Sequence, residues 1–184
     1  MKALEVHLAD RPTSVGNEDV EIFVEDVSEA DATAIARIYA YHVLNGTASY
    51  EVAPPSVEAT LTKIRQILAN GWPFLVAHTG RDVVGYAYVT QFRDREAYRF
   101  TAENSIYIDA AYQRAGYGKM LMKSLIERSR TYGFRTMIAV IGGAEPASIA
   151  LHSALGFSEV GRLKHVGFKF GRWLDSVYMQ RDIA

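Results

Sequence analysis

The sequence contains no cysteine among its 184 residues. This absence excludes a disulfide framework, a zinc site built from thiolates and a cysteine nucleophile. Long apolar runs are also missing, because no stretch approaches the ~18 residues that indicate a membrane-spanning helix. The first residues, MKALEVHLADRPTSVG, lack the apolar core of a signal peptide. We therefore expect a soluble cytoplasmic protein.

The chain also lacks an excess of charge of either sign. Its 20 Lys and Arg residues and 21 Asp and Glu residues give a formal net charge of −1 at pH 7. This balance provides no overall field that would attract nucleic acid or an acidic membrane, so neither is an expected partner. Apolar residues make up 49% of the chain and charged residues 22%, as in ordinary soluble globular proteins. The length suits one substantial core.

Sequence patterns divide the chain into an N-terminal extension, residues 1–19, and one domain, residues 20–184. The extension has scattered charge and little periodicity. In the domain we predict strands over 20–26, 73–78, 82–92, 101–109 and 135–141 and around 157–163 and 173–183, with helices after Ser28, after Ser56, beyond Gly118 and over 146–155. Residues 45–56 and 93–100 form a loop and a charged linker, and Thr79-Gly80-Arg81 forms a turn. The order predicts a single α/β (α+β) domain.

Each of the three longer predicted helices carries an apolar face. The expected faces consist of Ile35, Ile38, Tyr39, His42 and Val43 in the first, Val57, Leu61, Ile64 and Leu68 in the second, and Tyr117, Leu121, Met122, Leu125 and Ile126 in the third.

A glycine-rich stretch, QRAGYG, stands between a predicted strand and the third helix. Such a junction offers unpaired backbone N–H groups and the positive end of a helix dipole, which suit a phosphate. The alternative is a tight turn that needs glycine for its backbone alone. Two nucleotide motifs are excluded, because a dinucleotide-binding fingerprint needs a third glycine where Leu121 stands, and a P-loop needs Ser or Thr where Met120 stands.

The same stretch resembles the acetyl-CoA pyrophosphate loop of the GNAT superfamily of N-acetyltransferases. Together with ENSIYID, AVIGG, PASIALHSALGF and VGFKFGRWLDSVYMQ it resembles the branch that acetylates phosphinothricin and methionine sulfoximine. The similarity runs from about residue 20 to the C-terminus. It implies a single GNAT-like domain with a mixed, mostly antiparallel central sheet flanked by helices, acetyl-CoA as the acetyl donor, no metal, and a homodimer.

Direct transfer from a thioester requires a deprotonated amine, aligned reactants and stabilisation of charge on the thioester oxygen. The resemblance aligns Glu103 with the catalytic glutamate that takes the amine proton. A partly buried carboxylate has a raised pKa, which makes it a better base near neutral pH. The alternative is a solvated glutamate at a strand end.

His152 occupies the position where many enzymes of the superfamily have a tyrosine that protonates the leaving thiolate, and this branch has a histidine. The alternative for His152 is a core histidine with satisfied hydrogen bonds. None of the five histidines forms a close metal-ligand pattern such as HExxH, so we predict no metal.

The resemblance implies that backbone groups hold most of the cofactor. The expected contacts are Ile106, Tyr107 and Ile108 with the pantetheine, as an added strand, and Arg114, Ala115, Gly116, Tyr117, Gly118 and Lys119 with the pyrophosphate. Glu145 stands where the family usually has an asparagine that contacts CoA. A carboxylate cannot donate that hydrogen bond, so this contact is in doubt.

The acceptor side is expected to include Arg93 and Arg95, because a guanidinium matches the carboxylate of an amino acid. If their segment is extended, both side chains project from one face. The wider set of expected acceptor-binding residues is Arg93, Asp94, Arg95, Glu103, Asn104, Ser105 and Tyr50, with Tyr98 as a further wall. Lys169, Phe170 and Trp173 match a family block that closes the site or the dimer edge.

The sequence thus predicts an acetyl-CoA-dependent N-acetyltransferase acting on the α-amine of a small amino acid or analogue, such as phosphinothricin, methionine sulfoximine or methionine sulfone. Two alternatives stay open. One is acetylation of another amine, such as a polyamine or an aminoglycoside, which would favour acidic walls over paired arginines. The other is a non-catalytic acyl-CoA-binding module.

Overall fold

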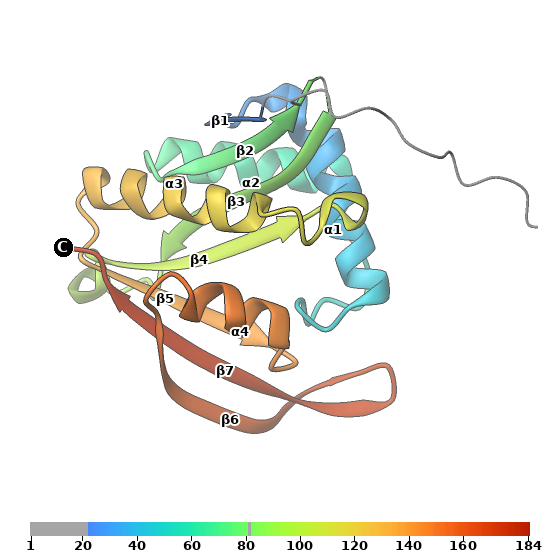
Figure 1. Cartoon of the computed structure of the whole chain (residues 1–184), viewed down its shortest axis with the longest axis vertical. Coiled ribbons are helices and arrows are strands. Elements are labelled where there is room, and N and C mark those ends of the chain that lie inside the picture. The colour runs from blue at the N-terminus through green and yellow to red at the C-terminus, as the bar shows by residue number, and fades with distance from the viewer. Residues whose placement is uncertain (1–21, 81) are drawn as a thin grey trace, which may run out of the picture.

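The computed structural model describes residues 22–80 and 82–184 (Figure 1). The predicted extension, residues 20 and 21 at the expected start of the domain, and Arg81 of the expected turn lie outside the described residues. The strands are β1 (Ile22–Asp26), β2 (Phe74–Thr79), β3 (Asp82–Gln91), β4 (Thr101–Ile108), β5 (Thr136–Gly142), β6 (Ser158–Lys169) and β7 (Arg172–Asp182). The helices are α1 (Ala32–Asn45), α2 (Val57–Ala69), α3 (Tyr117–Tyr132) and α4 (Pro146–Ser153), with 3₁₀ turns η1 (Glu29–Asp31), η2 (Glu96–Tyr98) and η3 (Ala110–Tyr112).

The strands form one seven-stranded sheet in the order β1-β2-β3-β4-β5-β7-β6. Strands β4 and β5 pair in parallel, and the other neighbouring pairs are antiparallel. This arrangement confirms the expected α/β fold with a mixed, mostly antiparallel sheet. The parallel pair is central, so the sheet changes its pairing mode in the middle.

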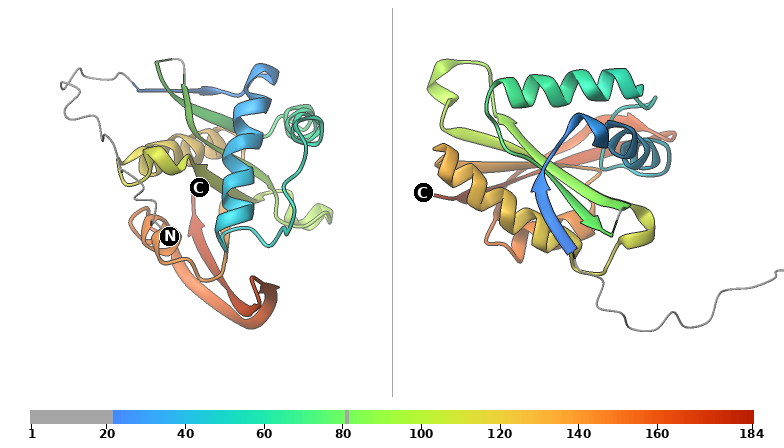
Figure 2. Two further views of the ribbon diagram at one scale, coloured as in Figure 1. Left: turned by 90° about the vertical axis from the view of Figure 1, so that its right-hand side faces the viewer. Right: turned by 90° about the horizontal axis from the view of Figure 1, so that it is seen from above.

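Helices cover both faces of the sheet, α1 and α2 on one and α3 and α4 on the other (Figure 2). One core packs α3 against the sheet through Leu121, Met122, Leu125 and Ile126, as predicted. The second core packs α1 and α2 against the opposite face. Along β4, Ala102 and Ile106 belong to the α3 side and Tyr107 to the α1 side, which is the alternation expected of a strand.

The predicted helix start after Ser56 is confirmed, whereas Ser28 caps η1 with α1 beginning at Ala32, and α3 begins at Tyr117 rather than beyond Gly118. The Asp31 carboxylate accepts hydrogen bonds from the Ser28 amide at 2.8 Å and from the Ser28 hydroxyl at 2.9 Å, and the Ser56 side chain accepts a hydrogen bond from the Ala59 amide at the start of α2. The expected apolar face of α2 is partly wrong. Its buried residues are Thr60, Ile64 and Ile67, whereas Val57 and Leu68 are exposed, because they lie in the terminal turns of the helix.

The β6–β7 hairpin forms one edge of the sheet (Figure 1). It carries a group of exposed apolar side chains. Its members, hereafter the hairpin surface, are Val160, Leu163, Val166, Phe168, Phe170 and Trp173, with exposed fractions from 47% to 63%. The Phe168 and Trp173 rings pack with their centroids 5.2 Å apart, and exposed apolar side chains that gather in this way are typical of an interaction surface.

Candidate active site

The central feature of the candidate site is an opening between β4 and β5. The parallel ladder runs from Thr101↔Thr136 to Asn104↔Ala139 and then ends. Beyond that point β4 continues to pair with β3, up to Gly85↔Ile108. The two central strands therefore separate from residue 105 onward (Figure 1).

One edge of this opening presents backbone groups that can pair with an added strand. The Asp109 amide donates to Val84 O in β3, and backbone groups alternate between the two sides of a strand. The amide and carbonyl of Ile106 therefore face the opening, and those of Tyr107 face β3. The Ile108 carbonyl also faces the opening, where His42 Nε2 lies 2.8 Å from it.

A cavity of 560 Å³ extends from this edge to the start of α3. It is lined by the end of α1, the following loop, β4, the glycine-rich stretch and the start of α4; lining residues include His42, Gly46, Thr47, Ala48, Ile106, Tyr107, Ile108, Arg114, Gly116, Gly118, Lys119, Glu145 and Ser148. The structure thus brings most of the predicted cofactor residues together. Glu145 lies among them, beside basic Arg114 and Lys119.

The structure explains the two glycines of QRAGYG in different ways. Gly116 is the N-cap of α3 and has a φ of 88°, a left-handed conformation that favours glycine. Gly118 is helical, and a Cβ placed on it would lie 3.5 Å from Leu151 Cδ2, an ordinary contact. The protein itself could therefore accommodate a side chain at residue 118. That side chain would occupy space at the helix N-terminus that a bound molecule would use.

Glu103 lies on β4, on the α1 side of the sheet by strand alternation. Its side chain is 31% exposed, and Arg93 Nη1 lies 3.8 Å from its Oε2. Burial raises the pKa of Glu103 above its ordinary value, and the charge of Arg93 opposes this shift. A carboxylate with these surroundings can accept a proton closer to neutral pH.

His152 approaches the opening from the other face, on α4. It is 2% exposed, and its Nε2 lies 3.0 Å from Asn104 Oδ1. The Asn104 amide donates to Ile138 O at 3.0 Å, so its oxygen is the group that faces the histidine. His152 Nδ1 lies 2.8 Å from Ser148 O. Burial lowers the pKa of His152, and the hydrogen bond with the Ser148 carbonyl opposes this shift.

A smaller pocket of 60 Å³ lies in the opening itself, hereafter the strand-gap pocket. It is lined by Asn104, Ser105, Ile106 and Tyr107 of β4, Ala139, Val140, Ile141 and Gly142 of β5, and Ala48, Ser148 and His152. Lining residues come from both faces of the sheet, so the pocket connects the side of Glu103 with the side of His152.

The acceptor residues are only partly assembled. Residues 92–95 form bends followed by the 3₁₀ turn η2, so the expected extended segment is wrong. The chain must reverse between β3 and β4 over these residues. Arg93 stacks over the Phe92 ring, and its Nη1 lies 3.8 Å from Glu103 Oε2. Both hydrogen bonds described for Arg95 are accepted by its carbonyl, one from the Gln91 side chain and one from the Tyr98 amide.

Four other residues predicted on the acceptor side occupy distinct places. The Asn104 amide is buried and directed to His152, and the Tyr50 hydroxyl is bonded to β7 and to Gly143. Tyr98 packs edge-on against Phe92. Asp94 is exposed in the bends after β3.

Sequence reasoning missed His42, Ser148 and the segment around Ala48 as site residues. For His42, the available signal was a polar residue within the apolar face of α1, which we assigned to packing. Among residues 22–80 and 82–184, no cluster of three or more His, Cys, Asp or Glu side chains has metal-binding geometry. No helix in the described part of the chain is long and apolar enough to cross a membrane.

Comparison with known proteins adds independent information. A family profile described as Acetyltransferase (GNAT) domain matches residues 24–178. The phosphinothricin N-acetyltransferase of Alcaligenes faecalis is 45% identical over 161 residues, which cover 87% of this chain and 82% of that protein. The L-methionine sulfoximine/L-methionine sulfone acetyltransferase of Salmonella typhimurium is 38% identical, over 84% of this chain and 91% of that protein.

A solved structure shows the same similarity in three dimensions. The GNAT superfamily phosphinothricin acetyltransferase from Sinorhizobium meliloti, crystallised in complex with AcCoA, superimposes with a TM-score of 0.86 at 49% identity, covering 88% of each chain. The open central sheet, the glycine-rich loop at the start of α3 and these matches lead to one conclusion: the chain belongs to the GNAT family of acetyltransferases.

Proposed function

We propose that this enzyme transfers an acetyl group from acetyl-CoA to the α-amine of a small amino acid or analogue, such as phosphinothricin, methionine sulfoximine or methionine sulfone. The relatives whose names state these substrates support the proposal. The observation that carries it is that Glu103 and His152 lie on opposite faces of the sheet near the point where β4 and β5 separate, with Arg93 beside Glu103.

The residues of the cavity fit acetyl-CoA. The free backbone groups of Ile106 would pair with the pantetheine as an added strand, and the start of α3 would receive the pyrophosphate. The space beside Gly118, which a side chain would fill, suits the close approach of a phosphate to the backbone. The thioester supplies an already activated acetyl group, so the protein needs no covalent intermediate.

Glu103 would act as the general base. The acceptor's ammonium group loses its proton to the carboxylate, directly or through water, and the free amine attacks the thioester carbon. Arg93 would hold the acceptor's carboxylate within reach of Glu103, since its guanidinium matches two oxygens. Ser105, on the same face of β4 as Glu103, lines the strand-gap pocket, so the amine would reach the thioester along this side of the strand.

His152 would serve the leaving group from the opposite face. Its Nε2 is held against Asn104, and it lines the strand-gap pocket where the thioester sulfur would lie. As the carbon–sulfur bond breaks, the thiolate takes a proton, and His152 is the ionisable group positioned to give it. Oxygen acceptors lie at both ring nitrogens, Ser148 O at Nδ1 and Asn104 Oδ1 at Nε2, so the ring can donate to both only when it carries two protons, which is the form that can act as the acid.

The enzyme would work in the cytoplasm as a homodimer that associates through the hairpin surface. Four of the apolar side chains of that surface, Val160, Leu163, Val166 and Phe168, lie on β6, a strand at the edge of the sheet. Edge strands that carry exposed apolar groups are prone to pair with a second chain.

The test is a panel of amino acids, amino-acid analogues and decarboxylated amines assayed by release of the CoA thiol. We expect turnover of the amino acids and little turnover of the amines. Preferential turnover of polyamines or aminoglycosides would show that the substrate is one of these amines and not an amino acid. Binding of acetyl-CoA without thiol release for any acceptor would favour a non-catalytic acyl-CoA-binding module.

A further inference from the structure

The strand-gap pocket is the place where the acyl group of the donor would lie, an inference that depends on the proposed function. A pantetheine paired with Ile106 leads along β4 to Asn104, where the parallel ladder closes. The pocket occupies this closing point and has His152 in its wall. A water molecule requires roughly 10–15 Å³, so 60 Å³ accommodates only a few atoms.

One wall of this pocket comes from outside the sheet. Ala48 belongs to the loop between α1 and α2, and it lines both the strand-gap pocket and the larger cavity. The size of the pocket therefore depends on where residues 46–50, hereafter the latched segment, are held. Two side chains, Lys169 and Tyr50, fix that segment to distant parts of the sheet.

Lys169, the last residue of β6, holds the latched segment on both sides of Ala48. Its amino group donates to Gly46 O at 2.9 Å and to Ser49 O at 2.7 Å, and the residue is 4% exposed. Burial lowers the pKa of this amine, and the charge of Glu51 opposes the shift. Burying an ammonium group costs free energy unless hydrogen bonds compensate for the lost water. Here the bonds go to carbonyls on both sides of Ala48, so Lys169 is suited to fixing the backbone of that residue.

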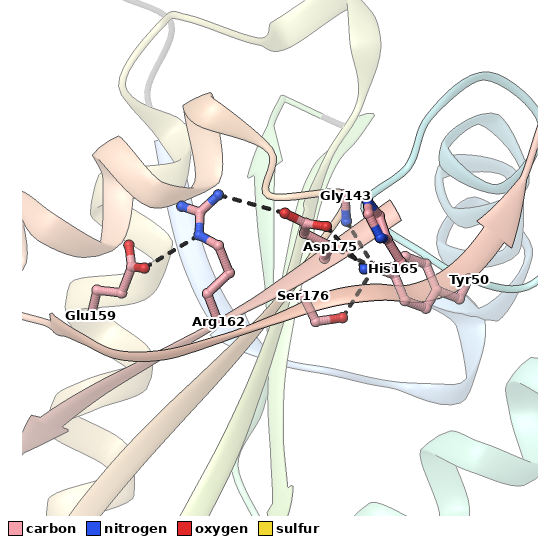
Figure 3. A network of polar contacts seen from close by, with 7 residues as sticks. All are labelled: Tyr50, Gly143, Glu159, Arg162, His165, Asp175 and Ser176. Atoms are coloured by element: carbon pink, nitrogen blue, oxygen red, sulfur yellow. Dashed lines mark hydrogen bonds and ion pairs between the residues drawn. The ribbon is translucent and has the colours of Figure 1, made fainter. Parts of the chain in front are cut away.

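Tyr50 holds the end of the segment (Figure 3). Its hydroxyl lies 2.8 Å from Asp175 O and 3.0 Å from Ser176 Oγ in β7, and it accepts a hydrogen bond from the Gly143 amide at 3.1 Å. Asp175 is itself held, since its Oδ1 accepts from the His165 amide at 3.0 Å. Tyr50 thus connects the segment to β7 and to the turn after β5.

Glycines let the latched segment lie directly on its neighbours. A Cβ on Gly142 would lie 2.8 Å from Thr47 O, and one on Gly167 would lie 2.6 Å from the Tyr50 ring. A Cβ on Gly143 would overlap the Thr47 side chain. Real Cβ atoms do not approach this closely, so any other residue at these positions would displace the segment from the end of β5.

We propose that the latched segment sets the length of the acyl group that the enzyme transfers, with Ala48 as the limiting wall and Lys169 and Tyr50 as positioning residues. The held wall admits an acetyl group and excludes longer chains. Removing a hydrogen bond at Lys169 or Tyr50 would let the wall retreat. A fitted apolar pocket discriminates against one extra methylene by roughly 10–200-fold.

The experiment compares kcat/KM for acetyl-CoA, propionyl-CoA and butyryl-CoA with one amino-acid acceptor. We expect the native enzyme to prefer acetyl-CoA over propionyl-CoA by at least about tenfold, the lower bound for one methylene. Ala48→Gly, Lys169→Met and Tyr50→Phe should each reduce that preference by several-fold, and Ala48→Val should increase it. Lys164→Met, at an exposed position on the same strand as Lys169, is the matched control and should leave the preference unchanged.

A merely structural role for Lys169 and Tyr50 would lower the rates with all donors by the same factor and would overturn the proposal. So would a native enzyme that uses the three donors equally. If Lys169→Met does not fold, the opposite shifts expected for Ala48→Gly and Ala48→Val decide the matter. A native enzyme that acetylates no amino acid would instead refute the proposed function.

Discussion

Arg93 Nη1 lies 3.8 Å from Oε2 of Glu103, across the connection that joins β3 to β4. This pair places a carboxylate-binding group and a proton acceptor together at the end of the opening in the sheet. The separation exceeds that of a direct hydrogen bond, so each group keeps donors or acceptors free for a third partner. An amino acid offers such a partner to both, its carboxylate to Arg93 and its ammonium to Glu103.

Replacing Glu103 with Gln should lower kcat by about 10²–10⁴-fold at neutral pH, the usual contribution of a general base. Acetyl-CoA affinity should be retained, because the change removes only the proton acceptor. Activity should partly recover at high pH, where more of the free amine is present. Steady-state kinetics and calorimetry measure both quantities, and native turnover by the variant at pH 7 would exclude the assigned role.

Arg93→Met should shift the acid side of the pH–rate profile to higher pH. Glu103 accepts a proton only when ionised, so activity falls as pH drops through its pKa. Burial raises that pKa and Arg93 lowers it, so removing the cation should raise it further. The midpoint in kcat/KM against pH is the measurement, with Arg95→Met as the matched control. An unchanged midpoint would show that Arg93 has no electrostatic effect on the base.

The elements and their order could be predicted from sequence because periodicity, caps and turns are local. The position of the 93–95 segment could not, since the reversal between β3 and β4 depends on how the strands pair. Lys169 is a clearer case. Its bonding partners Gly46 and Ser49 lie 123 and 120 residues away, and nothing local to GFKFGRW indicates that the amine is buried against them. Similarly, the contact of His42 with Ile108 O exists only once α1 packs along β4.

The two glycines at α3 should separate stability from cofactor binding. Gly116→Ala places a side chain at a φ of 88°, so it should destabilise the fold by about 1–2 kcal/mol. A Cβ at position 118 would make only an ordinary contact, 3.5 Å from Leu151 Cδ2, so the fold of Gly118→Val should persist while acetyl-CoA affinity falls by about tenfold or more, a change of at least ~1.4 kcal/mol. Thermal unfolding and calorimetry give the two readouts. If folded Gly118→Val binds acetyl-CoA with unchanged affinity, these glycines serve only the turn and not cofactor binding.

Charge introduced into the hairpin surface should disrupt the proposed homodimer. Phe168 is 59% exposed on the edge strand β6, and a glutamate there would have to be buried unpaired between two chains. Phe168→Glu should therefore give a monomer in light scattering coupled to size-exclusion chromatography. Leu68→Glu, an exposed apolar position on α2, should leave the native mass unchanged. A monomeric native protein would refute the proposed homodimer.

The contrast between Arg93 and Arg95 tests what the enzyme acts on. Both are expected from sequence to bind the acceptor's carboxylate, but the structure brings only the Arg93 guanidinium to Glu103 in the described contacts. A charged hydrogen bond contributes roughly 1.5–3 kcal/mol, about one to two decades in affinity. Arg93→Ala should therefore raise KM for an amino-acid acceptor by about that factor, and Arg95→Ala should raise it less.

The same variants should leave KM for acetyl-CoA nearly unmoved, because neither arginine lines the cofactor cavity. Decarboxylated analogues should be poor substrates of the native enzyme and should lose little more in Arg93→Ala, since they have no carboxylate to release. That difference separates a lost carboxylate contact from a general disturbance of the site, which would slow both kinds of acceptor equally. If the native enzyme acetylates an amino acid and its decarboxylated amine at the same rate, the carboxylate does not contribute to recognition, and the amino-acid substrate class is wrong.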